Sequence, residues 1–343
     1  MPKIIKAIPL LIFLLLLITP VYAASSPRPA TARPTNTDPN RIRIPRPFRV
    51  FDNPSFYATP IANFHPQYVH VIHRQGYWVL ISTRYGQLWA NVYPHPQGQE
   101  IAGFMYQFGD TVALFYENFA TGFTFAHQGD RVYFAASTTK APFALYIFHQ
   151  AEMGRTHMDD VITFTRGDRW DGTGIIRHRY RVGQTFTQER LLYLMLAPSD
   201  NIATRMLRRT HGVQGYRDFV ARMGGNPDFV QNITYSYLSA NEAGVFLRAF
   251  WDYINAGGRY SYMFRDFLLA NRTKLITASY PVASKSGWAG NFGGAWHDMA
   301  IVYAPSPYGL ALLSTRVGGT VADRRVYNEI SRFIQDFNNT WFE

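Results

Sequence analysis

The chain has 343 residues, of which 47% are hydrophobic and 16% aromatic, and its formal net charge is +11. This length and composition fit one large domain with a well-filled core together with one small domain. The chain contains no cysteine, which excludes disulfides, thiolate zinc sites and cysteine nucleophiles.

The N-terminal residues 1–23 have the pattern of a targeting segment. Lys3 and Lys6 precede an apolar run over residues 8–21, and Val21-Tyr22-Ala23 resembles a cleavage site with small residues. The run is short for a membrane-spanning helix and contains prolines, so we expect a cleaved signal peptide, with an uncleaved anchor as the alternative. The protein is therefore expected to be secreted or associated with the cell envelope.

Residues 24–47 hold six prolines and five arginines and almost no large apolar side chains, which predicts a semi-extended basic linker. A soluble basic protein is the simplest interpretation of the charge. Attraction to an anionic envelope, such as teichoic acids or acidic lipid, is the more specific one. We expect no nucleic-acid partner, because the protein is predicted to be exported and shows no nucleic-acid-binding motif.

Residues 48–95 consist of short strand-like runs separated by turns, the pattern of a small β-barrel. They resemble bacterial SH3-like domains in a V-x-V strand, a W-x-x-I strand, a glycine turn and a final tryptophan strand, here Val69 and Val71, Trp78 and Ile81, Gly86, and Trp89. The resemblance implies contact with cell-wall peptides through residues 48–95. The alternative is that both tryptophans only fill a core. Residues 94–99 are predicted as a second short linker, and residues 100–343 as the main domain.

Ser137-Thr138-Thr139-Lys140 is the first of three polar motifs in the main domain. Residues 112–116 and 123–125 before it have the pattern of strands. After the motif the apolar residues recur at helical spacing, and Pro142 is tolerated near a first helical turn. We therefore expect Ser137 at the N-terminus of a helix, with Lys140 on the same helix face.

Two further polar motifs follow. Ser199-Asp200-Asn201 comes directly after Pro198, which ends a helical stretch over residues 191–197. Lys285-Ser286-Gly287 precedes two apolar runs, residues 299–303 and 310–314, that are predicted as antiparallel strands. Each motif alone would commonly be a cap, a turn or a loop. Their order and spacing nevertheless suit three distant segments that meet in one cleft.

The chemistry of these residue types fits acyl transfer. A serine hydroxyl is a weak nucleophile until a base removes its proton, and Lys140 can be that base if burial or a nearby cation lowers its pKa. Lys285 would supply such a cation. The unpaired backbone N–H of Ser137 at a helix start can help to hold a developing oxyanion.

Together the three motifs resemble the S-x-x-K, S-D-N and K-[TS]-G set of serine β-lactamases and penicillin-binding proteins, in particular the class A β-lactamase-like catalytic domain. The resemblance implies an α+β fold, in which an antiparallel sheet flanked by helices is joined to a helical subdomain. A small SH3-like β-barrel would precede this β-lactamase/transpeptidase-like domain.

The resemblance also implies a role for each motif residue. Ser137 would form a covalent acyl-enzyme, Lys140 would be the general base, and Ser199 would relay a proton to the leaving nitrogen. The substrate-binding residues would be Asn201 for the substrate amide, Lys285 and Ser286 for a substrate carboxylate, Gly287 for close approach of the substrate backbone, and the backbone N–H of Trp288 as second oxyanion donor. Asp200 would be structural.

One group that the resemblance leads us to expect is missing. Class A β-lactamases carry, between the second and third motifs, a glutamate that activates the water for release of the acyl group. Residues 202–241 contain only the acids Asp218 and Asp228, and Glu242 is expected in the first turn of a helix capped by Ser239 or Asn241.

We therefore favour an exported serine hydrolase that forms an acyl-enzyme on D-alanyl peptidoglycan stem peptides or on β-lactams. One alternative is a true β-lactamase that activates water with another group. Another is a cell-wall-binding protein whose catalytic domain is idle. No cofactor or metal is expected, because the ten histidines form no recognisable ligand constellation, and the sequence does not predict the oligomeric state.

Overall fold

The structure is a computed structural model that describes residues 40–44, 48–54, 60–65, 67–75, 78–92, 96–231, 236–290, 294–315 and 321–342. The predicted signal peptide, residues 1–23, and most of the predicted linker, residues 24–47, lie outside the described residues. Within the described ranges, no helix is both long and apolar enough to span a membrane.

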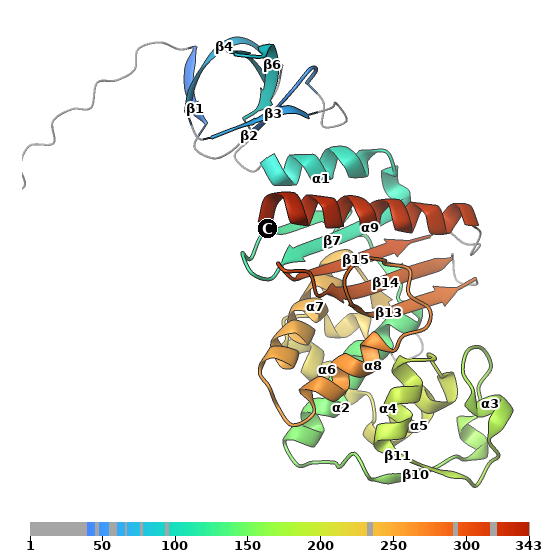
Figure 1. Cartoon of the computed structure of the whole chain (residues 1–343). Helices are drawn as coiled ribbons and strands as arrows, with labels where there is room; N and C mark the ends of the chain where they lie inside the picture. The colour runs from blue at the N-terminus through green and yellow to red at the C-terminus, as the bar shows by residue number, and fades with distance from the viewer. Residues whose placement is uncertain are drawn as a thin grey trace, which may run out of the picture.

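The N-terminal strands form one curled antiparallel sheet, drawn in blue in Figure 1. Its strand order is β1-β4-β5-β6-β2-β3. The bounds are β1 Arg41–Ile44, β2 Phe48–Phe51, β3 Pro60–Phe64, β4 Gln67–Gln75, β5 Trp78–Thr83 and β6 Gly86–Asn91. Because β1 and β3 lie at the two ends of this order, the described sheet is open, and a closed SH3-like barrel is not confirmed.

The core of this sheet is made of medium-sized aliphatic residues. Val69, Val71 and Ile81 belong to it, whereas Trp78 and Trp89 are only half-buried. Trp78 packs edge-on against Phe51, with 5.4 Å between ring centroids. The two tryptophans therefore lie at the margin of the core and do not fill it.

Two predicted linkers differ from the structure. Strand β1 falls inside the predicted linker 24–47, because Ile42 and Ile44 alternate with arginines, and Ile44 joins the core of the sheet. Residues 94–99 were predicted as a second linker, but helix α1 (Pro96–Tyr106) begins there. Proline is well suited to a first helical position, and Ile101 of α1 is fully buried.

The main domain is built on a five-stranded antiparallel sheet with the order β13-β14-β15-β7-β8. The bounds are β7 Val112–Asn118, β8 Thr124–His127, β13 Val282–Ala289, β14 Ala295–Val302 and β15 Tyr308–Ser314. Both faces of this sheet are buried. Along β7, for example, Val112, Leu114 and Tyr116 enter one core, while Ala113 enters the other.

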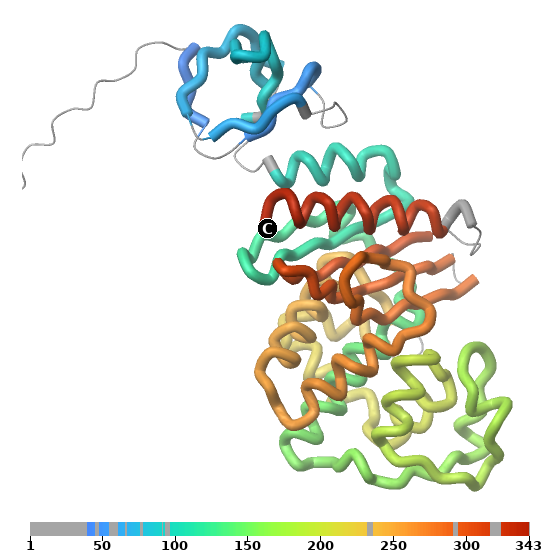
Figure 2. Tube along the Cα trace, viewed as in Figure 1, coloured from blue at the N-terminus to red at the C-terminus, as the bar shows by residue number. Residues whose placement is uncertain are grey.

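Helices cover both faces of this sheet (Figure 1). On one face lie α1 and α9 (Val321–Phe342), which are far apart in sequence but run side by side (Figure 2). Their contact includes Phe104 stacked on Phe333 at 3.8 Å. On the other face lie α2 (Lys140–Glu152), α7 (Ala240–Asn255) and α8 (Ser261–Leu269).

A helical subdomain extends from this second face. It contains β10 Val161–Thr163, η3 Arg166–Asp168, α3 Ile176–Arg179, β11 Thr185–Thr187, α4 Gln188–Leu196, α5 Asn201–His211, α6 Gln214–Arg222 and η4 Pro227–Phe229. The remaining short elements are η1 Gly109–Thr111, β9 Tyr133–Phe134, η2 Ala136–Thr139 and β12 Tyr237–Leu238. The expected antiparallel sheet flanked by helices, with a helical subdomain, is thus present.

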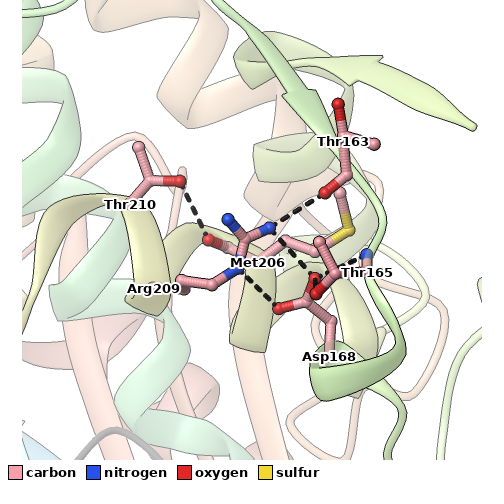
Figure 3. A network of polar contacts seen from close by, with 6 residues as sticks. All are labelled: Thr163, Thr165, Asp168, Met206, Arg209 and Thr210. Atoms are coloured by element: carbon pink, nitrogen blue, oxygen red, sulfur yellow. Dashed lines mark hydrogen bonds and ion pairs between the residues drawn. The ribbon is translucent and has the colours of Figure 1, made fainter. Parts of the chain in front are cut away.

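An ion pair ties α5 to the start of this subdomain (Figure 3). Arg209 donates from Nε and Nη2 to the two carboxylate oxygens of Asp168 at 2.9 Å and 3.0 Å. Its Nη2 also donates to the carbonyl oxygen of Thr163 at 2.9 Å. This bidentate pair fixes α5, whose N-terminus carries the second motif, against η3 and β10.

Candidate active site

Ser137 lies in η2, which continues directly into α2. The chain enters η2 from β9, and Ala136 adopts a φ of 48°, an uncommon value for a residue with a side chain. The hydroxyl of Thr138 donates to the carbonyl oxygen of Ala135 at 2.5 Å and braces this sharp turn. Ser137 is half-buried, so its hydroxyl is held on a rigid element next to solvent.

Lys140, one helical turn after Ser137, is buried, and its Nζ is held by the second motif. It lies within hydrogen-bond distance of the carbonyl oxygen of Ser199 at 2.7 Å, of Ser199 Oγ at 3.1 Å and of Asn201 Oδ1 at 2.7 Å. Burial lowers the pKa of Lys140 well below its ordinary value, and the charge of Lys285 lowers it further, while Asp200 acts in the opposite direction. A lysine with a lowered pKa can accept a proton from a serine hydroxyl.

The second motif forms the tight link between α4 and α5. Ser199 has a φ of 59°, in the left-handed region, and Asp200 caps α5. One carboxylate oxygen of Asp200 accepts hydrogen bonds from the backbone N–H groups of Ile202 and Ala203, and the other from those of Ile175 and Ile176. All four distances lie between 2.6 Å and 3.0 Å. Asp200 therefore has the geometry of a structural residue.

A glycine-containing loop, residues 171–175, supports the second motif and was not singled out from the sequence. Asn201 Nδ2 donates to the carbonyl oxygen of Asp171 at 2.8 Å, and the hydroxyl of Thr173 donates to that of Ser199 at 2.7 Å. Gly172 and Gly174 both have positive φ, and a Cβ at Gly174 would lie 2.4 Å from the carboxylate of Asp200. In the sequence, the Gly172-Thr173-Gly174 pattern is the feature that could have indicated this close approach.

The third motif precedes the two predicted strands, which are β14 and β15, but it also lies in a strand that was not predicted. Lys285-Ser286-Gly287 is part of β13, where it pairs with Met299 to His297 of β14. The run Val282–Ala289 mixes small and polar residues, so it lacks the apolar alternation that identifies a strand. In the described sheet β13 is an edge strand, so part of its backbone faces away from β14.

Lys285 is completely buried and points toward the other motifs. Its Nζ donates to Ser199 Oγ at 3.0 Å and to the carbonyl oxygen of Ser286 at 2.8 Å. Burial lowers the pKa of Lys285 to about 8, and the carboxylate of Asp298 opposes this effect. Lys285 is therefore a cation near neutral pH that can attract a substrate carboxylate.

Gly287 brings β13 against η2. A Cβ at this position would lie 2.9 Å from the backbone nitrogens of both Ser137 and Thr138 and 3.0 Å from the carbonyl oxygen of Ala135. Only glycine allows this approach. Next to it, the hydroxyl of Ser286 shares a 2.6 Å hydrogen bond with that of Thr273, and Trp288 is 59% exposed. The structure thus brings the three motifs together.

Two buried residues of β14, His297 and Asp298, support this site and were not predicted from the sequence. His297 Nε2 lies 3.0 Å from the carbonyl oxygen of Phe134, and its Nδ1 accepts from the backbone N–H of Ser314 at 3.1 Å. Burial lowers the pKa of His297 to about 4, so the ring is neutral. The proton is therefore on Nε2, where it holds the strand that leads into η2.

Asp298 lies behind Lys285. One of its carboxylate oxygens accepts from the backbone N–H groups of Leu275 and Ile276 at 2.8 Å and 3.0 Å. Burial raises the pKa of Asp298 to about 6, while these two hydrogen bonds and Lys285 act against the increase. No sequence motif marks either His297 or Asp298, because their contacts join residues that are distant in the chain.

The acidic residues between the second and third motifs have other partners. Asp218 accepts from Gln214 Nε2 on the surface of α6, and Asp228 pairs with Arg217 at 3.2 Å. Glu242 lies in the first turn of α7, capped by Ser239, one of the two predicted caps, and accepts from the backbone N–H of Asn226 at 2.8 Å. In the part of the chain that the structure describes, none of these carboxylates contacts Ser137 or Lys140.

No cluster of three or more histidine, aspartate or glutamate side chains that could bind a metal occurs among the described residues. The site consists of a serine, a buried lysine of lowered pKa, a second serine between two lysines, and a glycine strand edge. These groups, on this sheet with its helical subdomain, define the class A β-lactamase-like and penicillin-binding-protein-like serine hydrolases.

The comparison with protein families agrees with the geometry. The chain belongs to the Beta-lactamase enzyme family (Beta-lactamase2), whose family profile matches residues 97–337. This match contains all three motifs and begins within α1. No curated protein sequence gives a significant match.

Solved structures show the same fold at low sequence identity. The β-lactamase of Sphaerobacter thermophilus DSM 20745 is 19% identical, with a TM-score of 0.61 over 72% of this chain and 97% of that one. A mutant of PBP-A, solved as an acyl-enzyme complex with penicillin G, has the same identity, TM-score and coverage. The β-lactamase of Chitinophaga pinensis DSM 2588 is 20% identical, with a TM-score of 0.60 over 70% of this chain and 98% of that one.

Proposed function

We propose that the protein is an exported, envelope-facing serine hydrolase that forms an acyl-enzyme through Ser137 on D-alanyl stem peptides of peptidoglycan or on β-lactams. The observation that carries this proposal is the position of Ser199 Oγ between the side-chain nitrogens of Lys140 and Lys285, at 3.1 Å and 3.0 Å. This arrangement provides a base, a proton relay and an anion binder within one hydrogen-bonded group.

Acylation begins with transfer of the Ser137 proton to neutral Lys140, while the serine oxygen attacks the substrate carbonyl. The backbone N–H groups of Ser137 and Trp288 hold the developing oxyanion. Ser199 then delivers a proton to the leaving nitrogen and is reprotonated by Lys140. The bond between carbonyl carbon and nitrogen breaks, and the acyl group remains on Ser137.

Substrate binding uses the other motif residues. Lys285 and Ser286 bind the substrate carboxylate, and Asn201 binds the substrate amide. Gly287 leaves room for the substrate backbone along β13, since a side chain there would already meet the backbone of η2. A terminal D-alanine and a β-lactam both carry a carboxylate next to the amide that is broken, so one site can accept either.

The carboxylates between the second and third motifs, which could have activated a hydrolytic water, have other partners. This favours slow release of the acyl group. Asp228 is paired with Arg217, and Glu242 is bound to the backbone of Asn226. We therefore propose a peptidase, transferase or slow hydrolase of wall peptides in preference to an efficient β-lactamase. A mutant of PBP-A, a protein of similar fold, has been solved as an acyl-enzyme complex with penicillin G, which supports formation of an acyl-enzyme by analogy.

The test is intact-protein mass spectrometry after mixing with penicillin G, followed over time. We expect an adduct on the wild type that persists for many minutes and is absent from Ser137→Ala. An adduct on Ser137→Ala would reject Ser137 as the nucleophile. Steady nitrocefin hydrolysis at about one turnover per second or faster would instead support a true β-lactamase. Failure of every acylating agent to modify Ser137 would support an idle catalytic domain.

We also propose that the N-terminal sheet contacts the cell wall. Two aromatic side chains of this sheet, Tyr68 and Tyr85, are 54% and 52% exposed. Each has an arginine over its ring, Arg41 for Tyr68 and Arg84 for Tyr85. Exposed aromatic rings beside cations suit carbohydrate and peptide ligands. Retention of the full chain on purified peptidoglycan should decrease in the double variant Tyr68→Ala, Tyr85→Ala; undiminished retention would reject this surface.

A further inference from the structure

A pocket of about 170 Å³ lies beside the second motif, between the segment before α3 and the start of α5. Its lining consists of Phe164, Arg169, Trp170, Asp171, Arg177, Tyr180 and Ile202. The pocket adjoins the site described above: Ile202 follows Asn201 in the chain, and Asn201 Nδ2 donates to the carbonyl oxygen of Asp171. A group bound there would therefore lie next to the amide-binding asparagine.

The apolar part of this pocket is preformed. Phe164 and Ile202 are 2% and 3% exposed and belong to the core. Trp170 is covered on one side by the guanidinium of Arg205, 4.5 Å from the ring centroid. Tyr180 packs edge-on against Phe186 at 4.9 Å. These contacts hold the walls in place before a ligand arrives, which reduces the entropy cost of binding.

The chain segment that supplies most of the pocket lining is cationic. Residues 166–181 contain five arginines and two aspartates. One of these acids, Asp168, is bound on both carboxylate oxygens by Arg209 (Figure 3). The other, Asp171, lies 3.5 Å from Arg177 with a fully exposed side chain. Within the described ranges Arg169 has no acidic partner, so the rim presents an uncompensated guanidinium.

We infer that this pocket binds a carboxylate of the acyl-donor peptide, on a residue N-terminal to the bond that is cleaved; the inference rests on the proposed function. A guanidinium binds a carboxylate through two parallel hydrogen bonds, and the apolar floor suits the methylene groups of an acidic side chain. At ~30 Å³ per water, the pocket holds roughly the volume of five or six waters, which suits one side chain. The site thus selects acidic stem peptides over neutral ones.

The test uses two D-alanyl-D-alanine peptides that differ only in Glu or Gln upstream of the terminal pair. Acylation of full-length protein at Ser137 is measured as kcat/KM by competition with a fluorescent penicillin. We expect the wild type to prefer the Glu peptide about five- to tenfold, as partly exposed charge-assisted hydrogen bonds would give. In Arg169→Gln and in Arg177→Gln the preference should fall to within about twofold.

Two controls separate the site from general charge and from misfolding. Arg332→Gln removes an exposed arginine of α9, on the opposite face of the sheet, and should keep the wild-type preference. In the wild type, raising the salt to about 0.5 M should reduce the preference, which tests the inference even if an arginine variant does not fold.

Equal acylation of the wild type by both peptides would overturn this inference and leave the proposed function standing. A preference for the Glu peptide that persists in both pocket variants would do the same. Acylation by neither peptide would overturn this inference, and failure of the fluorescent penicillin to label Ser137 as well would overturn the proposed function.

Discussion

The side-chain nitrogens of Lys140 and Lys285 approach one and the same oxygen, the hydroxyl of Ser199, at 3.1 Å and 3.0 Å. Both lysines are buried, and burial lowers the pKa of each. The charge of Lys285 lowers the pKa of Lys140 further, so Lys140 is the one that loses its proton first. The pair therefore holds a neutral base and a cation side by side, with a hydroxyl between them that can carry a proton.

This relationship predicts the pH dependence of acylation. Lys140 acts as a base only when neutral, so the rate should rise with pH through its lowered pKa. In its proposed role Lys285 binds the substrate carboxylate only when charged, so the rate should fall as pH passes about 8. The measurement is the single-turnover rate of penicillin labelling between about pH 5 and pH 10. A penicillin methyl ester, which lacks the carboxylate, should lose the alkaline decrease; an unchanged profile with the ester would contradict the role of Lys285.

Replacing Lys285 tests the electrostatic coupling directly. Lys285→Gln removes the cation that disfavours protonated Lys140, so the pKa of Lys140 should rise and the acidic limb should move to higher pH. We also expect acylation by penicillin to fall about ten- to hundredfold, because a charge-assisted hydrogen bond to the carboxylate is lost. An acidic limb that stays in place, or moves to lower pH, would show that the two lysines are not coupled.

Asp298→Asn should move the alkaline limb to lower pH, the same direction in which added positive charge would move it. The carboxylate of Asp298 raises the pKa of Lys285, so its removal should lower that pKa and bring the decrease in acylation below pH 8. The amide oxygen of asparagine can still accept from the backbone N–H groups of Leu275 and Ile276. An alkaline limb that remains near pH 8 in a folded Asp298→Asn protein would refute this assignment.

The same substitution predicts a change in stability with pH. The pKa of Asp298 is raised from 3.8 to about 6 in the folded protein, so its contribution is most favourable below pH 3.8 and is lost as pH rises through about 6. This loss is at most about 3 kcal/mol. His297, with a pKa lowered to about 4, contributes the opposite trend over a similar range. Both proteins contain His297, so its contribution cancels in the difference in unfolding free energy between variant and wild type. This difference should favour Asp298→Asn increasingly from pH 4 to pH 7.

The sequence predicted those parts of the site whose geometry is local. Ser137 and Lys140 are separated by one turn, and Ser239 caps α7 through Glu242, so helical spacing alone places them. Antiparallel strands with clear apolar runs, such as β14 and β15, could also be predicted from the sequence. Strand β13 was not predicted, because the residues around Lys285 are small and polar. Its burial comes from the packing of η2 and α8 on it and not from its own hydrophobicity.

The remaining parts of the site depend on contacts between distant segments. Asp200 accepts hydrogen bonds from Ile175 and Ile176, and His297 meets Phe134 from a strand far along the chain. The hydrophobic periodicity of a sequence does not indicate such contacts between distant residues. The strand of residues 41–44 was missed for a related reason, since prolines and arginines around Ile42 and Ile44 outweighed two isoleucines in the composition.

Asp200→Asn should destabilise the domain even though the side chain keeps its shape. Four backbone N–H groups converge on the carboxylate, and an amide offers only one accepting oxygen. Two buried N–H groups would then face an NH₂ group, at a cost of about 2–4 kcal/mol in unfolding free energy. Urea denaturation measures this loss. Asp218→Asn, on the exposed surface of α6, is the matched control and should change stability by less than about 0.5 kcal/mol.

Gly287→Ala should abolish rapid acylation by displacing the backbone of the proposed nucleophile, Ser137. The added methyl group would lie 2.9 Å from the nitrogens of Ser137 and Thr138, so either β13 or η2 must move apart from the other. Since the N–H of Ser137 is one proposed oxyanion donor, we expect the labelling rate to fall about 10²–10³-fold. Gly98→Ala in α1 is the matched control, because its new methyl group would meet only Phe125 at an ordinary 3.7 Å and should leave labelling unchanged. Near-wild-type labelling of a folded Gly287→Ala protein would mean that the oxyanion is held elsewhere, and that the contact between β13 and η2 serves packing alone.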